Sequence, residues 1–299
     1  MRLLDLLKYG LSAAALAMLL YLVGPDKIIA TAAAMNPLLL PAIILLFAAG
    51  LAMGAYNLKI LTDALGVKIT YRQMTEYYLK SWAFGLIIPG KIGEFSFVYL
   101  ARKHMTTGQA MAVSVLDKMI TVITLLALSY IGFFIFLPPE QAIRLTLITA
   151  VAAAAGSAFL LTHAGRGLIK KLLGKYQNKF EGFSNALNHL VFRQRTAAAL
   201  NLGITLLKWQ LTAIVTYIAF LSFGQQINPL IILTISATAM LLSLIPITMS
   251  GLGVKEAASV YLYGLAGVAA PVTLSVQIVL LIINYLGAAL VFLLSRRSK

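Results

Sequence analysis

Six long apolar segments constrain this chain more than any other feature of its sequence. A helix that crosses the hydrocarbon core of a bilayer needs about 20 mostly apolar residues. The segments cover residues 7–24, 37–59, 108–137, 141–162, 196–223 and 271–295. Because lipid cannot satisfy an open backbone, they are predicted to be α-helices. The sequence therefore predicts an all-α, polytopic integral membrane protein with about six full spans, in which residues 1–299 form a single membrane domain.

The composition excludes several other classes of protein. Of the 299 residues, 61% are hydrophobic and 11% are charged, whereas a soluble domain usually has about 45–50% apolar and about 25% charged residues. A soluble enzyme, a disordered chain and a nucleic-acid-binding domain are therefore excluded. The chain has no cysteine, and His104, His163 and His189 lack the spacing of metal ligands. We therefore expect no disulfide, no metal site and no cofactor.

Two further apolar regions, 73–101 and 228–268, are interrupted by proline, glycine and charged residues. The interruptions run from Pro89 to Glu94 and from Pro246 to Glu256. Irregular backbone at membrane depth is tolerated only where protein buries it or where it lines a cavity. These regions are therefore predicted to be re-entrant helical hairpins or broken helices.

The distribution of basic residues predicts the orientation of the chain. Lysine and arginine occupy both termini, follow the second span and the first broken region, and cluster in 163–195, whereas 138–141 and 223–226 contain neither. Cytoplasmic loops carry the excess of these residues, so both termini are expected to be cytoplasmic in a multi-pass protein of the cell (inner) membrane. The basic segment 163–195 has the helical spacing of an amphipathic cytoplasmic helix that is attracted to anionic lipid.

The two halves of the chain show the same order of span, span, broken hairpin and span. The first half, 1–137, starts inside the cell, and the second half, 138–299, starts outside. Inverted repeats with a broken element in matching positions are typical of transporters with a site near the membrane midplane. Simple helix kinks are the alternative interpretation of the two breaks.

The breaks also resemble the signatures of a known family. Residues 84–94, followed by Arg102 and by Asp117-Lys118, are similar to the first signature of the flippase-like family that includes the membrane region of lysylphosphatidylglycerol synthases. Residues 245–256 are similar to its second signature, and the resemblance covers nearly the whole chain. Members with synthase activity have an additional aminoacyl-transferring domain, whereas this sequence ends at Lys299, shortly after its last span. The resemblance therefore implies lipid handling and flipping, and we expect no enzymatic activity.

Charged residues inside a membrane are costly, so each one is a candidate functional residue. The N-terminus of a half-helix can bind the phosphate of a lipid headgroup, with glycines that allow close approach and lysines that neutralise charge. The substrate-binding candidates are Gly90, Lys91, Gly93, Glu94, Arg102, Asp117, Lys118, Lys208, Ser250, Gly251, Gly253, Lys255 and Glu256. The proton-coupling candidates are Glu94, Glu256 and Asp117, and Ser96 and Thr248 offer further hydroxyl groups.

Other interpretations of these residues remain open. The two breaks can each hold a structural ion pair, Lys91 with Glu94 and Lys255 with Glu256. Successive residues of a helix do not face one another, so Asp117 and Lys118 are each expected to find a partner elsewhere. In the related family an acidic residue is often followed here by arginine, and Lys118 keeps that charge without the bidentate geometry.

The leading hypothesis is a transporter or flippase that moves an anionic, phosphate-bearing lipid or a polyprenyl-phosphate carrier between leaflets, with proton coupling as an option. Its predicted partners are membrane lipids with anionic headgroups, and a second copy of the chain or a lipid-pathway enzyme is the predicted protein partner. One alternative is a non-transporting partner of lipid or glycolipid synthesis enzymes. The other is an intramembrane lipid-linked transferase, although the sequence has no Asp-rich Mg²⁺ motif and no nucleophile–histidine arrangement.

Overall fold

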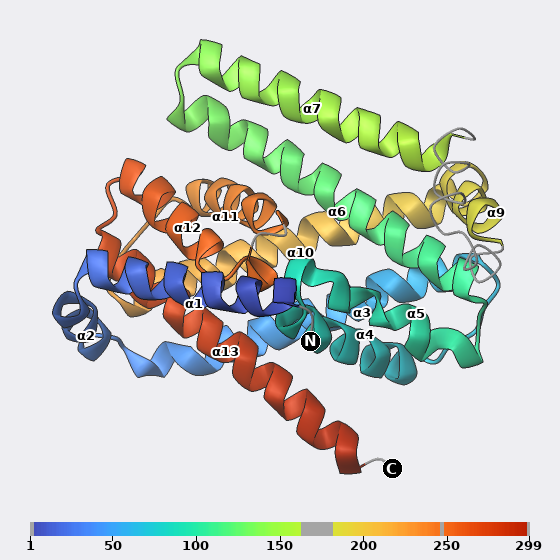
Figure 1. The fold of residues 1–299 in the computed structure, drawn as a ribbon, viewed down its shortest axis with the longest axis horizontal. Coiled ribbons are helices and arrows are strands. Elements are labelled where there is room, and N and C mark those ends of the chain that lie inside the picture. The colour runs from blue at the N-terminus through green and yellow to red at the C-terminus, as the bar shows by residue number, and fades with distance from the viewer. Residues whose placement is uncertain (1–2, 163–181, 246–247, 298–299) are drawn as a thin grey trace. The chain divides into compact units, whose positions relative to one another are not determined.

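The computed structural model describes residues 3–162, 182–245 and 248–297, and within these ranges the chain is helical and contains no strand. Its helices are α1 (Leu3–Val23), α2 (Pro25–Ala33), α3 (Leu40–Ala64), α4 (Tyr71–Ile87), α5 (Ser96–Leu100), α6 (Thr107–Phe136), α7 (Pro139–Leu161), α9 (Phe183–Asn188), α10 (Arg195–Ser222), α11 (Pro229–Ser243), α12 (Val254–Leu265) and α13 (Ala270–Arg297). Shorter helical turns are η1 (Pro37–Leu39), η2 (Pro89–Phe95), η3 (Ala101–Lys103), η5 (His189–Arg193) and η6 (Met249–Gly251). The predicted all-α membrane fold is confirmed (Figure 1).

Five helical segments of the described chain are long and apolar enough to cross a membrane: Pro37–Ala64, Thr107–Phe136, Pro139–Phe159, Arg195–Ser222 and Ala270–Ser295. The first predicted span differs from them, because α1 and α2 meet at an angle of 80° and supply a sixth span only if they are counted together. Gly24 makes this bend with φ +96°, a conformation that L side chains rarely adopt, and Pro25 starts α2.

Both predicted interruptions are present in the backbone. In the first, α4 ends at Ile87 and is followed by the 3₁₀ turns of η2 before α5. In the second, α11 ends at Ser243 and α12 begins at Val254, with η6 between them. We call the segment 88–95 the first break and the segment 244–253 the second break. With 15 residues, α11 is shorter than a full span, as expected for one arm of a hairpin.

The described chain divides into two compact units, and the division does not follow the predicted repeats. Unit 1 consists of residues 1–51, 79–94 and 208–299, and unit 2 consists of residues 52–78 and 95–207. Each unit therefore takes segments from both halves of the sequence. The inverted repeat itself stays a prediction.

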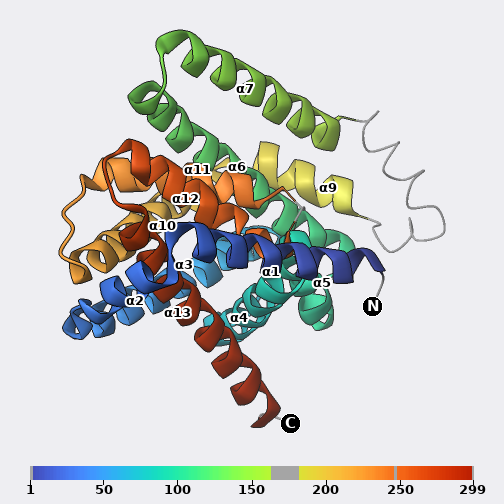
Figure 2. The same cartoon turned by 60° about the vertical axis from the view of Figure 1, so that its left-hand side comes forward.

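Unit 1 contains both breaks. In this unit α11 packs against α12, α12 packs against α13, and α1 packs against α2, α12 and η6. The α11 and α12 helices lie side by side in both views (Figure 1, Figure 2). The ring of Tyr263 in α12 lies 4.7 Å from that of Phe220 in α10, and both side chains are fully buried. These contacts hold the two arms of the second hairpin together.

Unit 2 has its own apolar core. Its largest fully buried contributors include Leu61, Ile69, Met74, Phe97, Leu187 and Leu190. Leu187 and Leu190 belong to the predicted amphipathic segment 163–195, of which residues 163–181 lie outside the described chain. In the described part, α9 packs against α6, and Leu187 and Leu190 are buried in this core, whereas Phe192 in η5 is exposed. The interfacial role of the whole segment stays a prediction.

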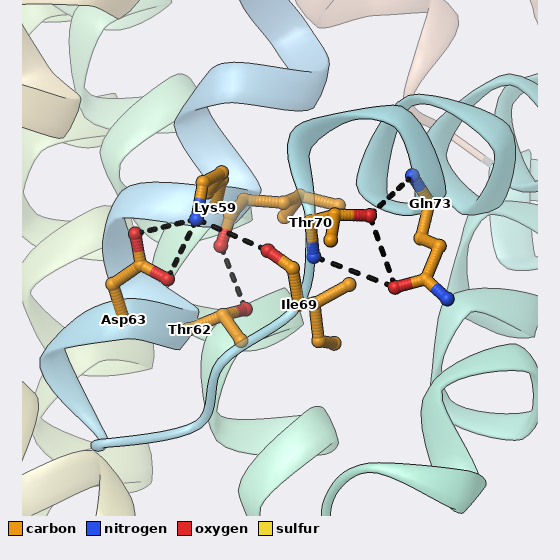
Figure 3. Close-up of polar contacts among 7 residues, drawn as sticks. Lys59, Thr62, Asp63, Ile69, Thr70 and Gln73 are labelled. Carbon is orange, nitrogen blue, oxygen red and sulfur yellow. Dashed lines mark hydrogen bonds and ion pairs between the residues drawn. The ribbon is translucent and has the colours of Figure 1, made fainter.

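The connection between α3 and α4 shows how unit 2 fixes its loops (Figure 3). Lys59 Nζ donates to both carboxylate oxygens of Asp63 at 2.9 and 2.8 Å and to the carbonyl oxygen of Ile69 at 3.1 Å. At the start of α4, Gln73 N donates to Thr70 Oγ1, and Thr70 N donates back to Gln73 Oε1. This reciprocal pairing satisfies backbone donors that have no partner inside the helix.

We expect Thr70→Ala to lower the free energy of unfolding by about 1 kcal/mol, because it removes the cap of α4. Thermal unfolding in detergent measures the effect. The matched control is Thr75→Ala, one turn further along, where the hydroxyl donates only to the carbonyl oxygen of Tyr71 in the same helix. Equal midpoints for the two variants would contradict the assignment of Thr70 as a cap.

Candidate substrate site

Each break contains one residue with a strained backbone. Lys91 has φ 58° and Ser250 has φ 49°, and no other residue of the described chain except glycine has a positive φ. Such conformations cost of order 1–3 kcal/mol each and concentrate at functional sites, where the surrounding structure enforces them. The sequence predicted the position of the two breaks, but not that a lysine and a serine would adopt this conformation.

The first break folds back on the end of α4. A Cβ atom on Gly93 would collide with the carbonyl group of Phe84, so the two backbones are in direct contact. Gly85, in the last turn of α4, leaves room for the side chain of Glu94 in the same way. These glycines therefore let the break pack closely against the helix that precedes it.

The second break is equally tight. A Cβ atom on Gly251 would collide with Ser243, and one on Gly253 would lie 2.6 Å from the Cβ atom of Ala15 in α1. Both glycines also have positive φ, at 77° and 85°. The structure thus assigns Gly93, Gly251 and Gly253 a role in packing, and the approach of an anion to their backbone stays a prediction.

Glu256 is the third residue of α12, and its side chain caps the start of this helix. Its side chain is buried, and its Oε2 atom accepts a 2.7 Å hydrogen bond from the backbone N–H of Gly253. With the residues that the structure describes, the neighbouring Lys255 forms no hydrogen bond or ion pair. The structural ion pair that was the alternative interpretation of these two residues is therefore not formed.

The α1 helix contacts the second break and the end of α4 beside the first break, which sequence reasoning did not foresee. Tyr9 donates from its hydroxyl group to the carbonyl oxygen of Ile87 at 3.0 Å, next to the first break. Ser12 accepts a 2.6 Å hydrogen bond from the backbone N–H of Met249 in the second break. With Ala15 against Gly253, the contacts lie at i, i+3 and i+6 on α1, the spacing of one helix face. In the sequence, the spacing of Tyr9, Ser12 and Ala15 was the signal from which this contact face of α1 could have been predicted.

A second contact links the first break to the arm of the other hairpin. Lys91 Nζ lies 3.4 Å from Met240 Sδ, near the end of α11. On the α13 side, the hydroxyl of Tyr285 donates to the carbonyl oxygen of Leu86 at 3.4 Å. Within unit 1, helices α1 and α11 therefore connect the surroundings of the two breaks.

The polar groups around the second break are not all satisfied. Thr248 Oγ1 and Ser250 Oγ are buried, and the described residues offer neither a hydrogen-bond partner. Lys255 is half-buried, as is Lys91. The second break and the first turn of α12 thus contain two buried hydroxyl groups and one lysine, Lys255, which are groups that can donate hydrogen bonds to a phosphate.

The remaining candidates divide between the units. Unit 1 contains Gly90, Lys91, Gly93, Glu94, Lys208, Ser250, Gly251, Gly253, Lys255 and Glu256, and unit 2 contains Arg102, Asp117 and Lys118. Lys208 is half-buried on α10. Arg102 is exposed and stacks on the ring of Tyr99, with its guanidinium carbon 3.9 Å from the ring centre. Arg102 in η3 thus has a local partner, the ring of Tyr99 in α5.

Asp117 lies at the centre of a buried polar network in unit 2. Asn201 Nδ2 donates to Asp117 Oδ1 at 3.3 Å and to the backbone oxygen of Asn57 at 3.2 Å, while Asn57 Nδ2 donates to Thr205 Oγ1 at 2.8 Å. These contacts join α3, α6 and α10. Lys118 Nζ lies 3.5 Å from Asp117 Oδ2. The neighbours therefore do contact each other, contrary to what their spacing predicts, while Asp117 also has the expected partner on another helix, Asn201.

We expect Gly93→Ala to destabilise the protein by about 1–3 kcal/mol, because the added methyl group must displace the end of α4. The control is Gly203→Ala in the interior of α10, where a Cβ atom would meet no atom within 4 Å. That control is expected to leave stability unchanged or to raise it, since alanine favours the helix. Thermal unfolding that ranks the two variants in the opposite order would contradict the close contact at Gly93.

Comparison with known proteins agrees with this architecture. An UPF0104 membrane protein of Methanothermobacter thermautotrophicus is 24% identical over 299 residues, which take in 91% of this chain and 88% of the relative. A second UPF0104 membrane protein of that organism is 29% identical over 121 residues, or 40% of this chain and 33% of the relative. The profile of the lysylphosphatidylglycerol synthase TM region matches residues 6–291, which include both breaks and every predicted site residue. The chain therefore belongs to the family of the lysylphosphatidylglycerol synthase transmembrane region.

Proposed function

We propose that this protein is a lipid transporter, a flippase that moves an anionic, phosphate-bearing lipid or a polyprenyl-phosphate carrier between leaflets. The observation that carries the proposal is the pair of strained breaks in unit 1, accompanied by Lys91 and Lys255, with α1 in contact with the second break and with the end of α4 beside the first. The family membership supports a membrane-lipid context, since the family is described by a lysylphosphatidylglycerol synthase.

The second break offers the chemistry that a phosphate headgroup needs. Lys255 lies in the first turn of α12, where the helix dipole also favours negative charge. Glu256 already takes the N–H of Gly253, so the lysine and the buried hydroxyls of Thr248 and Ser250 are the groups left for a ligand. A buried hydroxyl without a partner costs free energy, and binding of a headgroup removes that cost.

The proposed transport needs only the headgroup to enter the protein. Acyl or polyprenyl chains remain in the lipid, which offers them the same apolar surroundings throughout. The two breaks contain the irregular backbone, which is the part of a membrane protein that can change its hydrogen bonds without melting a whole span. We therefore place the moving parts at the breaks.

Proton coupling by Glu256 can be tested separately from its function as the cap of α12. Glutamine keeps an oxygen that can accept from the Gly253 N–H, as in capping boxes that use Glu or Gln, but it cannot exchange a proton. Glu256→Gln therefore tests proton coupling with α12 still capped. Glu256→Ala removes both functions and serves as the comparison.

We expect Lys255→Ala to slow headgroup translocation in proteoliposomes by about tenfold or more, since a hydrogen bond to a charged group contributes about 1.5–3 kcal/mol. Lys68→Ala is the matched control, because Lys68 is exposed in the α3–α4 connection. If the carboxylate couples transport to protons, Glu256→Gln abolishes the response to a pH gradient. Unchanged rates in both Lys255→Ala and Glu256→Gln would refute the site and favour a non-transporting partner.

We also propose that the protein lies in the cell membrane with both termini in the cytoplasm, on the basis of its loop charges. The chain has no cysteine, so single cysteines report orientation without background. An impermeant maleimide added to intact cells should label Glu140→Cys, in the first turn of α7, and should leave Lys68→Cys, in the α3–α4 connection, unlabelled until the cells are opened. The reverse pattern would invert the orientation.

A further inference from the structure

We propose that the Asp117 network in unit 2 is a binding site for a monovalent metal cation, with Na⁺ as the ion to test. The proposal does not rest on lipid transport, because its test measures ion binding. It departs from the expectation of no metal site, which considered cysteine and histidine ligands and Asp-rich Mg²⁺ motifs but not a single carboxylate among amide oxygens. The network uses a carboxylate with amide and backbone oxygens, which are the ligands that hard cations prefer.

The first argument is the incomplete compensation of a buried charge. The side chain of Asp117 is 5% exposed, and its carboxylate contacts are long: 3.3 Å to Asn201 Nδ2 and 3.5 Å to Lys118 Nζ. Charge-assisted hydrogen bonds usually measure about 2.7–2.9 Å. The exposed pair of Lys59 and Asp63 reaches 2.8 Å. A buried carboxylate needs close partners more than an exposed one does, yet Asp117 has the looser contacts.

The second argument is the kind of atom that lacks a partner. Asn57 and Asn201 are completely buried, and the Oδ1 atom of each accepts no hydrogen bond from the described residues. The unsatisfied atoms of the network are therefore oxygens, and what they require is a donor or a cation. The amide groups that hold them are the ones that bond to Thr205 and Asp117, so the oxygens belong to the same cluster.

The third argument is the position of Asn201 Nδ2. This atom lies within 3.3 Å of two oxygens from different helices, Asp117 Oδ1 on α6 and the backbone oxygen of Asn57 on α3. Rotation of the Asn201 amide by half a turn moves the unpartnered Oδ1 atom into the place of Nδ2, beside Asp117 Oδ1 and the backbone oxygen of Asn57, and moves Nδ2 to the place that Oδ1 leaves. A cation between the three oxygens would then be bound by α3, α6 and α10 together. One carboxylate among neutral ligands matches a single positive charge better than a double one.

Lys118 provides a sharp test, because its ammonium group already lies next to the Asp117 carboxylate that would bind the cation. A metal cation at Asp117 Oδ1 is repelled by this lysine, whose side chain is 38% exposed and so reaches toward the surface. Lys118→Met should therefore lower the Na⁺ concentration that gives half-maximal binding. If Asp117 and Lys118 are only a structural pair, the same substitution leaves a buried carboxylate alone and destabilises the protein without any Na⁺ effect.

The experiment compares thermal unfolding of the purified full chain in NaCl and in choline chloride at equal ionic strength. We expect Na⁺ to raise the midpoint by about 3 °C or more at saturation, because a ligand of the native state stabilises it. Asp117→Asn and Asn201→Leu should abolish the rise. Asp63→Asn, which removes the carboxylate of the exposed pair, is the matched control and should keep it.

Equilibrium dialysis with radioactive Na⁺ keeps the proposal testable if a variant folds poorly. We expect one ion per chain in the original protein and in Asp63→Asn, and tighter binding in Lys118→Met. Equal stabilisation by choline, a Na⁺-dependent rise that persists in Asp117→Asn, or no bound ion in the original protein would each overturn the proposal. The last outcome would leave ordered water as the partner of the amide oxygens.

Discussion

The requirement that every buried backbone polar group find a partner governs this structure. The long helices meet it internally, but the two breaks cannot, and lipid offers no replacement. Side chains from other elements supply what is missing: Ser12 accepts from the N–H of Met249, Glu256 from that of Gly253, and Tyr9 donates to the carbonyl oxygen of Ile87. Each break is therefore possible only in the company of the helices packed around it.

Local signals in the sequence predicted the elements well. Apolar runs placed the spans to within a few residues, and Pro89 and the glycines of 246–253 marked both breaks, because these signals act through the chain's own backbone. The 80° bend after Val23 was not predicted, although Gly24-Pro25 stands at its corner. An angle between helices depends on what they pack against, and a single sequence does not contain that information.

The site was predicted as a set of residues, and its arrangement was not. The strained backbone of Lys91 and Ser250, the use of Glu256 as a cap and the part played by α1 all arise from contacts between distant segments. The glycines illustrate the ambiguity, since a residue without a side chain can admit a ligand or a neighbouring segment. At Gly251 and Gly253 the neighbour is part of the chain itself.

The contacts of α1 have a mechanical consequence. Tyr9 and Ser12 are three residues apart on one rigid helix, and they hold residues 87 and 249, which are far apart in the sequence. An α-helix moves as a rigid body, so a displacement of α1 along its axis strains both hydrogen bonds at the same time. The end of α4 beside the first break and the second break are therefore mechanically coupled through α1.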